Sequence, residues 1–332
     1  MKKDKKSNKR SLYLRLCSGC AVLSLIGAMS IGDGARVSAA GHLGHTDSYT
    51  GYSAAPAAYN ANVTESRVGK IHYNLPGIPS RNLWSYDQIN LTLNGRSVGA
   101  GAIRINGITY LPLKEVTDAI GGATLKYSSD TKTVTLTMPS LLLSATDGGY
   151  VIYANDRPLF SFSPSVKMSN GRMYLPASAL CKALGLSIEE KSGSVSLRGT
   201  YRALTPASKF YREDEVYWLS KIISAEAAGE TLLGQIAVGD VIMNRVYSTQ
   251  YPNTIYGVIF DRKYGVQFSP TADGRIYGTP TYTATLASKI ILEGVSLTDD
   301  AMFFLNPGVA ESNWITKNRE YAYTIGNHDF YK

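Results

Sequence analysis

The sequence predicts an α+β protein made of two units, a small repeated α+β domain followed by a mainly helical domain. The first unit is indicated by an internal repeat, because the pattern NGxxYLP at residues 106–112 returns at residues 170–176. The second is indicated by residues 212–246, where apolar residues recur at helical spacing on both sides of a glycine. A chain of 332 residues is long enough to bury two separate cores.

Residues 1–40 have the order of a secretory signal peptide: basic residues, an apolar run at 17–31 and small residues before Gly41. We expect export and cleavage before Ala40 or Gly41, which leaves no stable membrane anchor. An uncleaved anchor is the alternative, but Ser and Gly interrupt the run and it is short for a membrane span. This segment holds +6 of the formal net charge of +8, so nucleic acid is not an expected partner.

Residues 41–82 are rich in Gly, Ser, Ala, Tyr and Asn and show no hydrophobic period, which is typical of a flexible linker. His42 and His45 within it are interpreted as solvated side chains rather than metal ligands. After removal of the signal peptide, Cys181 is the only cysteine. The mature chain is therefore expected to have no intramolecular disulfide and no cysteine metal site.

Each copy of the repeat is expected to form a hairpin, a helix and a further strand. The pairs Asn-Gly at 94–95 and Asn-Asp at 155–156 stand between apolar runs, which is typical of tight hairpin turns. Gly121 and Gly185 close the two helix-like runs. The predicted helices are residues 113–120 and 177–184, and the predicted strands after them are residues 133–137 and 194–197. Two such copies make one small α+β domain, which we place at residues 83–200.

This repeated unit resembles the copper amine oxidase N-terminal-like domain, on the two NGxxYLP copies with their following helix and Gly, over residues 89–199. The resemblance does not bring copper with it, because no His lies between Leu91 and Thr200 and Cys181 is the only thiol there. We therefore expect no metal and no cofactor. The expected role is that of a wall-binding or spacing module.

The second domain, which we place at residues 211–332 after a linker at 201–210, begins with an amphipathic helix. Its apolar stripe runs through Val216, Leu219 and Ile223. Glu226 is the next member of this stripe. A carboxylate in that position is paired, neutral or functional, because burying it ionised and alone is expensive. Gly229 is expected to end the helix in a left-handed conformation.

Two further helices are expected in this domain. One begins at about Thr231 and carries apolar residues on its core face. Another begins at Pro280, with Thr279 as its cap, and runs to Glu293. Polar and aromatic segments between and after the helices are expected to form loops and short strands.

Six short motifs and one Trp occur in order in this domain: Ala225-Glu226 with Gly229-Glu230, Gly234 to Val238, Asn244 to Val246, Gln267 to Ser269, Phe304 to Pro307, Trp314, and Ile325 to Phe330. Together they resemble the cell-wall hydrolase family of spore cortex-lytic enzymes (SleB type). The resemblance implies a lysozyme-like fold related to lytic transglycosylases, cleavage of the bond between N-acetylmuramic acid and N-acetylglucosamine in peptidoglycan, and Glu226 as the catalytic residue. One departure is Ala228, where relatives often carry Arg, so a basic contact near the acid is missing.

A lytic transglycosylase needs only one carboxyl group. A neutral Glu226 protonates the leaving oxygen, and the carboxylate then takes the proton of the muramoyl 6-hydroxyl, which attacks the anomeric carbon and closes a 1,6-anhydro ring. Apolar neighbours such as Ile222 and Ile223 are expected to raise the pKa of Glu226 from about 4.3 towards about 6. The candidate substrate-binding residues are Gln267, Ser269, Asn306, Tyr323 and His328. His328 is equally suited to fasten the end of the chain.

Ordinary glycoside hydrolysis uses two carboxylates. A water-using muramidase with Asp240 or Asp273 as the second carboxylate is therefore the alternative enzymatic hypothesis. Glu230 is interpreted as a cap for the amides of the next helix rather than as a catalytic group.

Two non-catalytic alternatives remain open. Glu226 could be a core residue held by Arg245 or His328, and the whole chain could be a catalytically silent wall-binding protein. The favoured interpretation is a secreted enzyme of the cell wall or spore, with peptidoglycan glycan strands as its partner.

Overall fold

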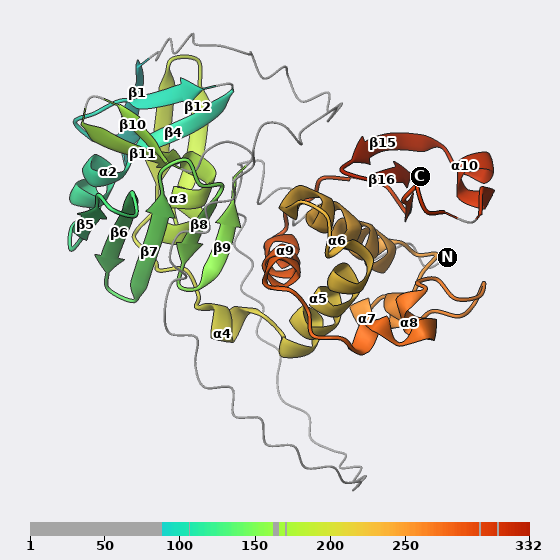
Figure 1. The fold of residues 1–332 in the computed structure, drawn as a ribbon. Coiled ribbons are helices and arrows are strands. Elements are labelled where there is room, and N and C mark those ends of the chain that lie inside the picture. Colours follow the sequence, from blue (N-terminus) through green and yellow to red (C-terminus); the bar gives the residue numbers. More distant parts are fainter. Residues whose placement is uncertain (1–87, 106, 162–165, 170, 299, 311) are drawn as a thin grey trace, which may run out of the picture.

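The computed structural model describes residues 88–332 apart from 106, 162–165, 170, 299 and 311, and it contains two domains (Figure 1). The expected signal peptide at 1–40 and linker at 41–82 lie outside the described residues. Within the described part, no helix combines the length and the apolar character that a membrane crossing requires.

Two sheets form the repeat domain. The larger has the strand order β10-β11-β4-β3-β1-β13-β12, with β2 paired to β1, and the smaller has the order β5-β6-β7-β8-β9. Their bounds are β1 Gln88–Leu93, β2 Arg96–Ser97, β3 Ala102–Ile105, β4 Ile108–Pro112, β5 Thr124–Ser128, β6 Thr133–Met138, β7 Leu141–Thr146, β8 Val151–Ala154, β9 Arg157–Phe160, β10 Lys167–Ser169, β11 Arg172–Pro176, β12 Ser187–Lys191 and β13 Ser194–Arg198.

The two copies of the repeat pair with each other inside the larger sheet. Strand β4 of the first copy runs antiparallel to β11 of the second, with Leu111 opposite Leu175. The first strand, β1, pairs in parallel with the last, β13. Both copies therefore contribute to one core and form a single domain.

The turns and helices of the repeat follow the sequence pattern. Asn94 and Gly95 have φ of 50° and 82°, and Asn155 and Asp156 have φ of 49° and 63°. Positive φ at both central residues is the mark of a type I′ hairpin turn, as predicted. Helices α2 (Leu113–Ile120) and α3 (Ala177–Leu184) have the predicted bounds.

The C-terminal domain is built on three helices that pack together, α5 (Glu213–Ala227), α6 (Leu232–Tyr247) and α9 (Tyr282–Leu292). Leu219, Ile222 and Ile223 of α5 are fully buried in their shared core. Shorter helices cover one side of it: α7 Ile255–Ile259, α8 Pro270–Asp273 and the 3-10 helix η2 Arg275–Tyr277.

Two helix ends differ from the prediction. Helix α5 ends at Ala227, and Ala228 is still in helical conformation (φ −57°, ψ −30°), so Gly229 is not a left-handed cap. The chain turns there because the amide of Glu230 donates to the carbonyl of Ala227. Helix α9 begins at Tyr282 rather than at Pro280.

The cap of α9 explains its later start. Thr281, not Thr279, has the capping geometry, and its Oγ1 accepts a hydrogen bond from the amide of Ala284. Helix α6 begins as predicted, because Thr231 caps it by accepting from the amide of Gly234.

A small sheet closes the chain beside α6. Its order is β14-β16-β15, with bounds Phe303–Leu305, His328–Tyr331 and Tyr321–Ile325, and α10 (Trp314–Asn318) lies between β14 and β15 in the chain. Phe330 of this sheet and Val241 of α6 are buried in one apolar cluster. The predicted α+β architecture, with a β-rich domain before a mainly helical one, is confirmed.

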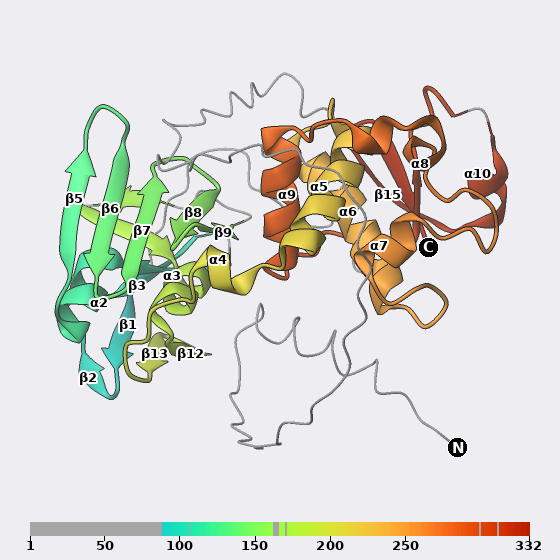
Figure 2. The same cartoon turned by 90° about the horizontal axis from the view of Figure 1, so that it is seen from below.

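The repeat domain contacts the helical domain through the β8–β9 hairpin and α9, which lie side by side in both views (Figures 1 and 2). Val151, Tyr153 and Phe160 of the hairpin pack against the core of the helical domain. The expected linker at 201–210 is fixed as well, since Leu204 packs on the repeat core and residues 207–210 form α4 (Ala207–Phe210).

A buried carboxylate joins the two domains at the end of α9. Arg157 donates two hydrogen bonds of 2.7 Å to Glu293, one to each oxygen, and the two side chains are 4% and 2% exposed. Lys182 forms an ion pair with Glu293 at 2.7 Å, and Tyr211 donates to it at 2.5 Å. Burial alone would raise the pKa of Glu293, but Arg157, Lys182 and Tyr211 outweigh it and hold the pKa below its usual value.

We expect Glu293→Gln to lower the free energy of unfolding by about 3 kcal/mol near pH 7, because it leaves the buried Arg157 without its counter-charge. The pKa of Glu293 is depressed in the folded state, so this contribution is full above about pH 4.3 and disappears as the pH falls through the folded pKa. Urea unfolding followed by circular dichroism at several pH values measures it. Glu189→Gln is the matched control, because Glu189 also pairs with Lys191 and Arg198 but is 37% exposed. Equal losses in both variants would contradict the account.

Candidate active site

Glu226 lies in the last turn of α5, where the helix packs against its neighbours. Its side chain is largely withdrawn from solvent, and this burial raises its pKa to about 7; Arg275 lowers the pKa and Asp273 raises it as smaller influences. Among the residues that the structure describes, no basic side chain forms an ion pair with this carboxyl. A carboxyl group with this pKa is substantially protonated at neutral pH and is able to donate a proton.

The structural alternative for Glu226 is wrong. Arg245 donates to the carbonyl of Met302 at 2.8 Å and to Oε1 of Gln267 at 3.4 Å. His328 faces Glu230, with 3.5 Å between Nδ1 and Oε1. Neither side chain therefore holds Glu226.

The end of α5 is fastened on two sides. The amide of Thr281 donates to Oγ of Ser224 at 3.1 Å, which ties the start of α9 to this turn. Arg275 donates from Nη1 to the carbonyl of Ala225 at 3.3 Å. Ala227 is buried in the cluster shared with α6 and the small sheet. The backbone on both sides of Glu226 is thus held by other elements.

Arg275 is the functional candidate that sequence reasoning missed. It also donates from Nη2 to Oγ of Ser269 at 3.2 Å and from Nε to Oδ2 of Asp273 at 2.8 Å. It therefore brings one predicted substrate residue, Ser269, to the end of α5. The Asp-Gly turn at 273–274 is the only local signal in the sequence, and it does not reveal which helix end the arginine reaches.

Of the other predicted substrate residues, Gln267 and Asn306 sit in loops. Gln267 accepts from Arg245 and donates to the carbonyl of Gly265 at 3.2 Å. Asn306 accepts from the amide of Gly308 at 2.9 Å, as a turn residue does. Neither forms a hydrogen bond or an ion pair with Glu226 within the described part of the chain.

Tyr323 and His328 belong to the small sheet. The ring of Tyr323 lies 5.5 Å from that of Phe330, and His328 is 6% exposed, with its ring 5.5 Å from Phe304. Burial lowers the pKa of His328, while the nearby Glu230 raises it to a smaller extent. The ring of Phe304 lies 6.4 Å from Phe268, so a row of aromatic rings connects this sheet with the loop of Gln267 and Ser269.

Glu230 fastens the hairpin turn between β15 and β16. Its side chain is 7% exposed and accepts from the amide of Asn327 at 3.1 Å and from Nδ2 of Asn327 at 2.9 Å. The prediction that it caps α6 is wrong, because Thr231 does so. Its carbonyl instead accepts from Nε2 of Gln235 at 3.0 Å.

Asp240 also has a structural role. Its Oδ2 accepts four hydrogen bonds from the segment 296–298, and the residue is 3% exposed. Asp273 is different, because its side chain is 44% exposed and its charge acts on Glu226. Within the described residues, no group of three or more His, Cys, Asp or Glu side chains is placed to hold a metal ion.

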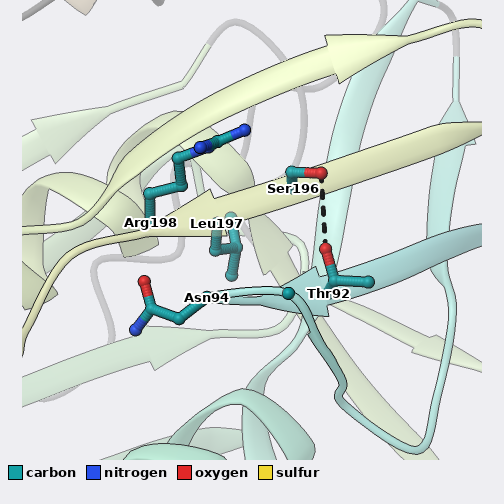
Figure 3. Close-up of a pocket in the computed structure, with 6 residues that line it drawn as sticks. Thr92, Asn94, Ser196, Leu197 and Arg198 are labelled. Atoms are coloured by element: carbon teal, nitrogen blue, oxygen red, sulfur yellow. Dashed lines mark hydrogen bonds between the residues drawn. The ribbon is translucent and has the colours of Figure 1, made fainter.

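A separate hollow of about 410 Å³ lies in the repeat domain, where β1 and β13 run side by side (Figure 3). Asn94 at its edge donates to and accepts from the backbone of Gly199. Arg198 pairs with Glu189, and Thr92 donates to Ser196. These polar groups serve the hairpin and the strand pair, so the hollow does not indicate a ligand.

Comparisons with known proteins match both domains. Residues 229–331 match the family model described as Cell Wall Hydrolase, and residues 92–197 match the one described as Copper amine oxidase N-terminal domain. The family assignments made from the sequence are thereby confirmed for both domains. Glu226 lies three residues before the segment 229–331 that matches the Cell Wall Hydrolase family.

The chain is similar to spore cortex-lytic enzymes. The enzyme of Bacillus cereus is 39% identical over 122 residues, which cover 37% of this chain and 46% of the relative. That of Bacillus subtilis is 35% identical over 120 residues, which cover 36% of this chain and 38% of the relative. The matched segment thus spans less than half the length of these relatives.

A solved structure is also similar, the catalytic domain of the germination-specific lytic transglycosylase SleB from Bacillus anthracis. It is 38% identical with a TM-score of 0.34 and covers 39% of this chain and all of that chain.

We expect Gly326→Ala to break the contact that Glu230 makes with the β15–β16 turn. Gly326 has φ +60°, and a Cβ there would overlap the Glu230 carboxylate. Gly265→Ala is the matched control, because Gly265 has φ +92° with nothing within 4 Å of the added Cβ. The 326 variant should lose about 2 kcal/mol more unfolding free energy than the control, since hydrogen bonds to a buried charge are lost as well. Equal losses in urea unfolding would show that Glu230 does not fasten this turn.

Proposed function

We propose that the C-terminal domain cleaves the bond between N-acetylmuramic acid and N-acetylglucosamine in peptidoglycan as a lytic transglycosylase. The observation that carries the proposal is the Glu226 carboxyl at the end of α5, which burial brings to a pKa of about 7 and which no ion pair occupies within the described residues, as suits a general acid at neutral pH. The match to the cell wall hydrolase family and the similarity to spore cortex-lytic enzymes support the same reaction.

The reaction uses Glu226 twice. Its proton passes to the glycosidic oxygen as the bond to the anomeric carbon breaks, and the N-acetylglucosamine side leaves as an alcohol. The carboxylate then takes the proton of the muramoyl 6-hydroxyl, whose oxygen bonds to the anomeric carbon and closes the 1,6-anhydro ring. Glu226 ends the cycle protonated, so no second carboxylate and no cofactor is needed.

Ser269, Gln267 and Asn306 are proposed to bind sugar hydroxyl and N-acetyl groups. Ser269 is exposed and linked by Arg275 to the end of α5, which supports its place beside the reacting bond. Tyr323 is proposed to bind sugar groups in the same way. The burial of His328 favours the fastening role over substrate contact.

Hydrolysis by water with Asp273 as the second carboxylate is the alternative. Asp273 is exposed and its charge acts on Glu226, which favours it over Asp240 and Glu230, since these use their oxygens within the fold. Against it stands the ion pair with Arg275, which occupies the Asp273 carboxylate.

The wider setting is also a proposal. The order of residues 1–40 supports export to the cell wall or spore, and the relatives' name supports the cortex as substrate. The repeat domain at 83–200 is proposed to bind or space the enzyme on the wall. The balanced charge of the mature chain speaks against nucleic acid as a partner.

We expect Glu226→Gln to reduce turnover of purified peptidoglycan by roughly 10²-fold to 10⁴-fold, because the amide keeps the size but has no proton to donate. Release of soluble glycan measures it. Glu215→Gln at the other end of α5 is the control and should retain activity, since Glu215 is 40% exposed and lies at the start of the helix.

An active Glu226→Gln variant would overturn the assignment of the acid. A wild-type protein that binds purified peptidoglycan without cleaving it would instead establish the silent wall-binding protein.

A further inference from the structure

We propose that Arg275 is a positioning residue of this reaction: its guanidinium, fixed by three protein partners, supplies a cation beside Glu226, and Asp273 both anchors this cation and offsets its charge. The inference rests on the proposed function, because it assigns a role to Arg275 in the proton transfer from Glu226. It extends that function to a pair of charged residues outside the six motifs.

Three protein groups anchor the Arg275 guanidinium. Its three donor nitrogens reach Ala225, Ser269 and Asp273 at 3.3, 3.2 and 2.8 Å. Asp273 Oδ1 in turn accepts from the backbone amide of Arg275 at 2.9 Å. The planar, forked guanidinium is thus held by acceptors in different directions, although the side chain is 57% exposed.

The Arg275 guanidinium lies at the carboxyl end of α5, bound to the residue next to Glu226 in the chain. The carbonyl of Ala225 belongs to the residue directly before Glu226, so the guanidinium sits at the carboxyl end of α5. Cations are favourable at this end of a helix, because its last carbonyls carry partial negative charge. Arg275 supplies a positive charge at this helix end from the η2 segment.

Arg275 and Asp273 have opposite effects on the proton affinity of Glu226. Burial favours the protonated form of Glu226 before reaction, while Arg275 favours its carboxylate and Asp273 disfavours it. When the proton leaves for the glycosidic oxygen, the new negative charge is stabilised by a cation that needs no movement to meet it. When the muramoyl hydroxyl returns a proton, the same balance restores the neutral acid.

Other charged groups around the end of α5 are engaged elsewhere. Lys221 of α5 donates to the carbonyls of Tyr277 and Gly278. Glu230 and His328 face each other at the small sheet, and Arg245 of α6 binds Met302 and Gln267. The 273–275 pair is therefore the charged pair whose removal should change the proton affinity of Glu226.

The test is a titration of the Glu226 side chain by NMR with ¹³C-labelled glutamate, assigned by the signal that is absent in Glu226→Gln. Asp273→Asn leaves the cation unopposed and should lower the midpoint by roughly half a pH unit or more. Arg275→Gln leaves the anion unopposed and should raise it by a similar amount. The alkaline limb of kcat/KM against pH should move with the midpoint in each variant.

Turnover is the second readout. Arg275→Gln should lower kcat roughly tenfold, because the nascent carboxylate loses its cation, and Arg275→Lys should recover part of this loss. The matched controls are Arg212→Gln and Asp214→Asn, an exposed pair at the start of α5, and neither should move the titration. Circular dichroism checks that all variants fold.

The outcomes separate the two claims. Midpoints that stay in place, or that move in the same direction in both variants, overturn this inference while an inactive Glu226→Gln keeps the proposed function intact. A fully active Glu226→Gln overturns the proposed function, and this inference with it.

Discussion

A buried carboxyl group stays protonated unless cations or hydrogen-bond donors replace the water it has lost, and Glu226 is placed where burial dominates. The three-helix core of α5, α6 and α9 provides the apolar surroundings, and the end of α5 is tied to α9 through Ser224 and to η2 through Ala225. These contacts fix the acid on a rigid helix rather than on a loop. The proposed reaction depends on this, because a general acid must meet its oxygen within hydrogen-bond distance.

Three other carboxyl groups with little solvent exposure in the described part of the chain are held by protein partners. Glu293 meets Arg157, Lys182 and Tyr211, Asp240 accepts four hydrogen bonds, and Glu230 accepts two from Asn327. Each of these joins segments that lie far apart in the sequence. Glu293, Asp240 and Glu230 use their oxygens to join segments of the fold. Within the described residues no ion pair holds the Glu226 carboxyl, so it is available as a proton donor.

The contact at Glu293 also shows that the two domains pack against each other. The sequence suggests separate units joined by a linker, whereas the β8–β9 hairpin lies along α9 and the residues after 200 pack on the repeat core (Figure 2). Because α9 also anchors the end of α5 through Thr281, the repeat domain rests on a helix that supports the site. The arrangement gives the repeat domain a fixed orientation relative to Glu226.

Local patterns in the sequence predict what local physics decides. The helices at 113–120 and 177–184, the hairpin turns and the burial of Glu226 all follow from periodicity and turn residues. The end of α5 and the cap of α9 were misplaced, because the backbone conformation of Gly229 and the capping geometry of Thr281 do not follow from residue type alone. Arg275 was missed for a different reason. Its contact with Ala225 joins positions 50 apart in the chain, and no spacing rule reports such a contact.

Mass spectrometry of glycan fragments released in ¹⁸O-labelled water tests the central claim most directly, namely that Glu226 is the only carboxyl group that reacts and the sugar supplies the nucleophile. The account predicts fragments that end in 1,6-anhydromuramic acid and contain no oxygen from the solvent. Reducible muramic acid ends that carry the label would contradict it and would identify a hydrolase. Asp273 would then be the leading candidate for the second carboxylate.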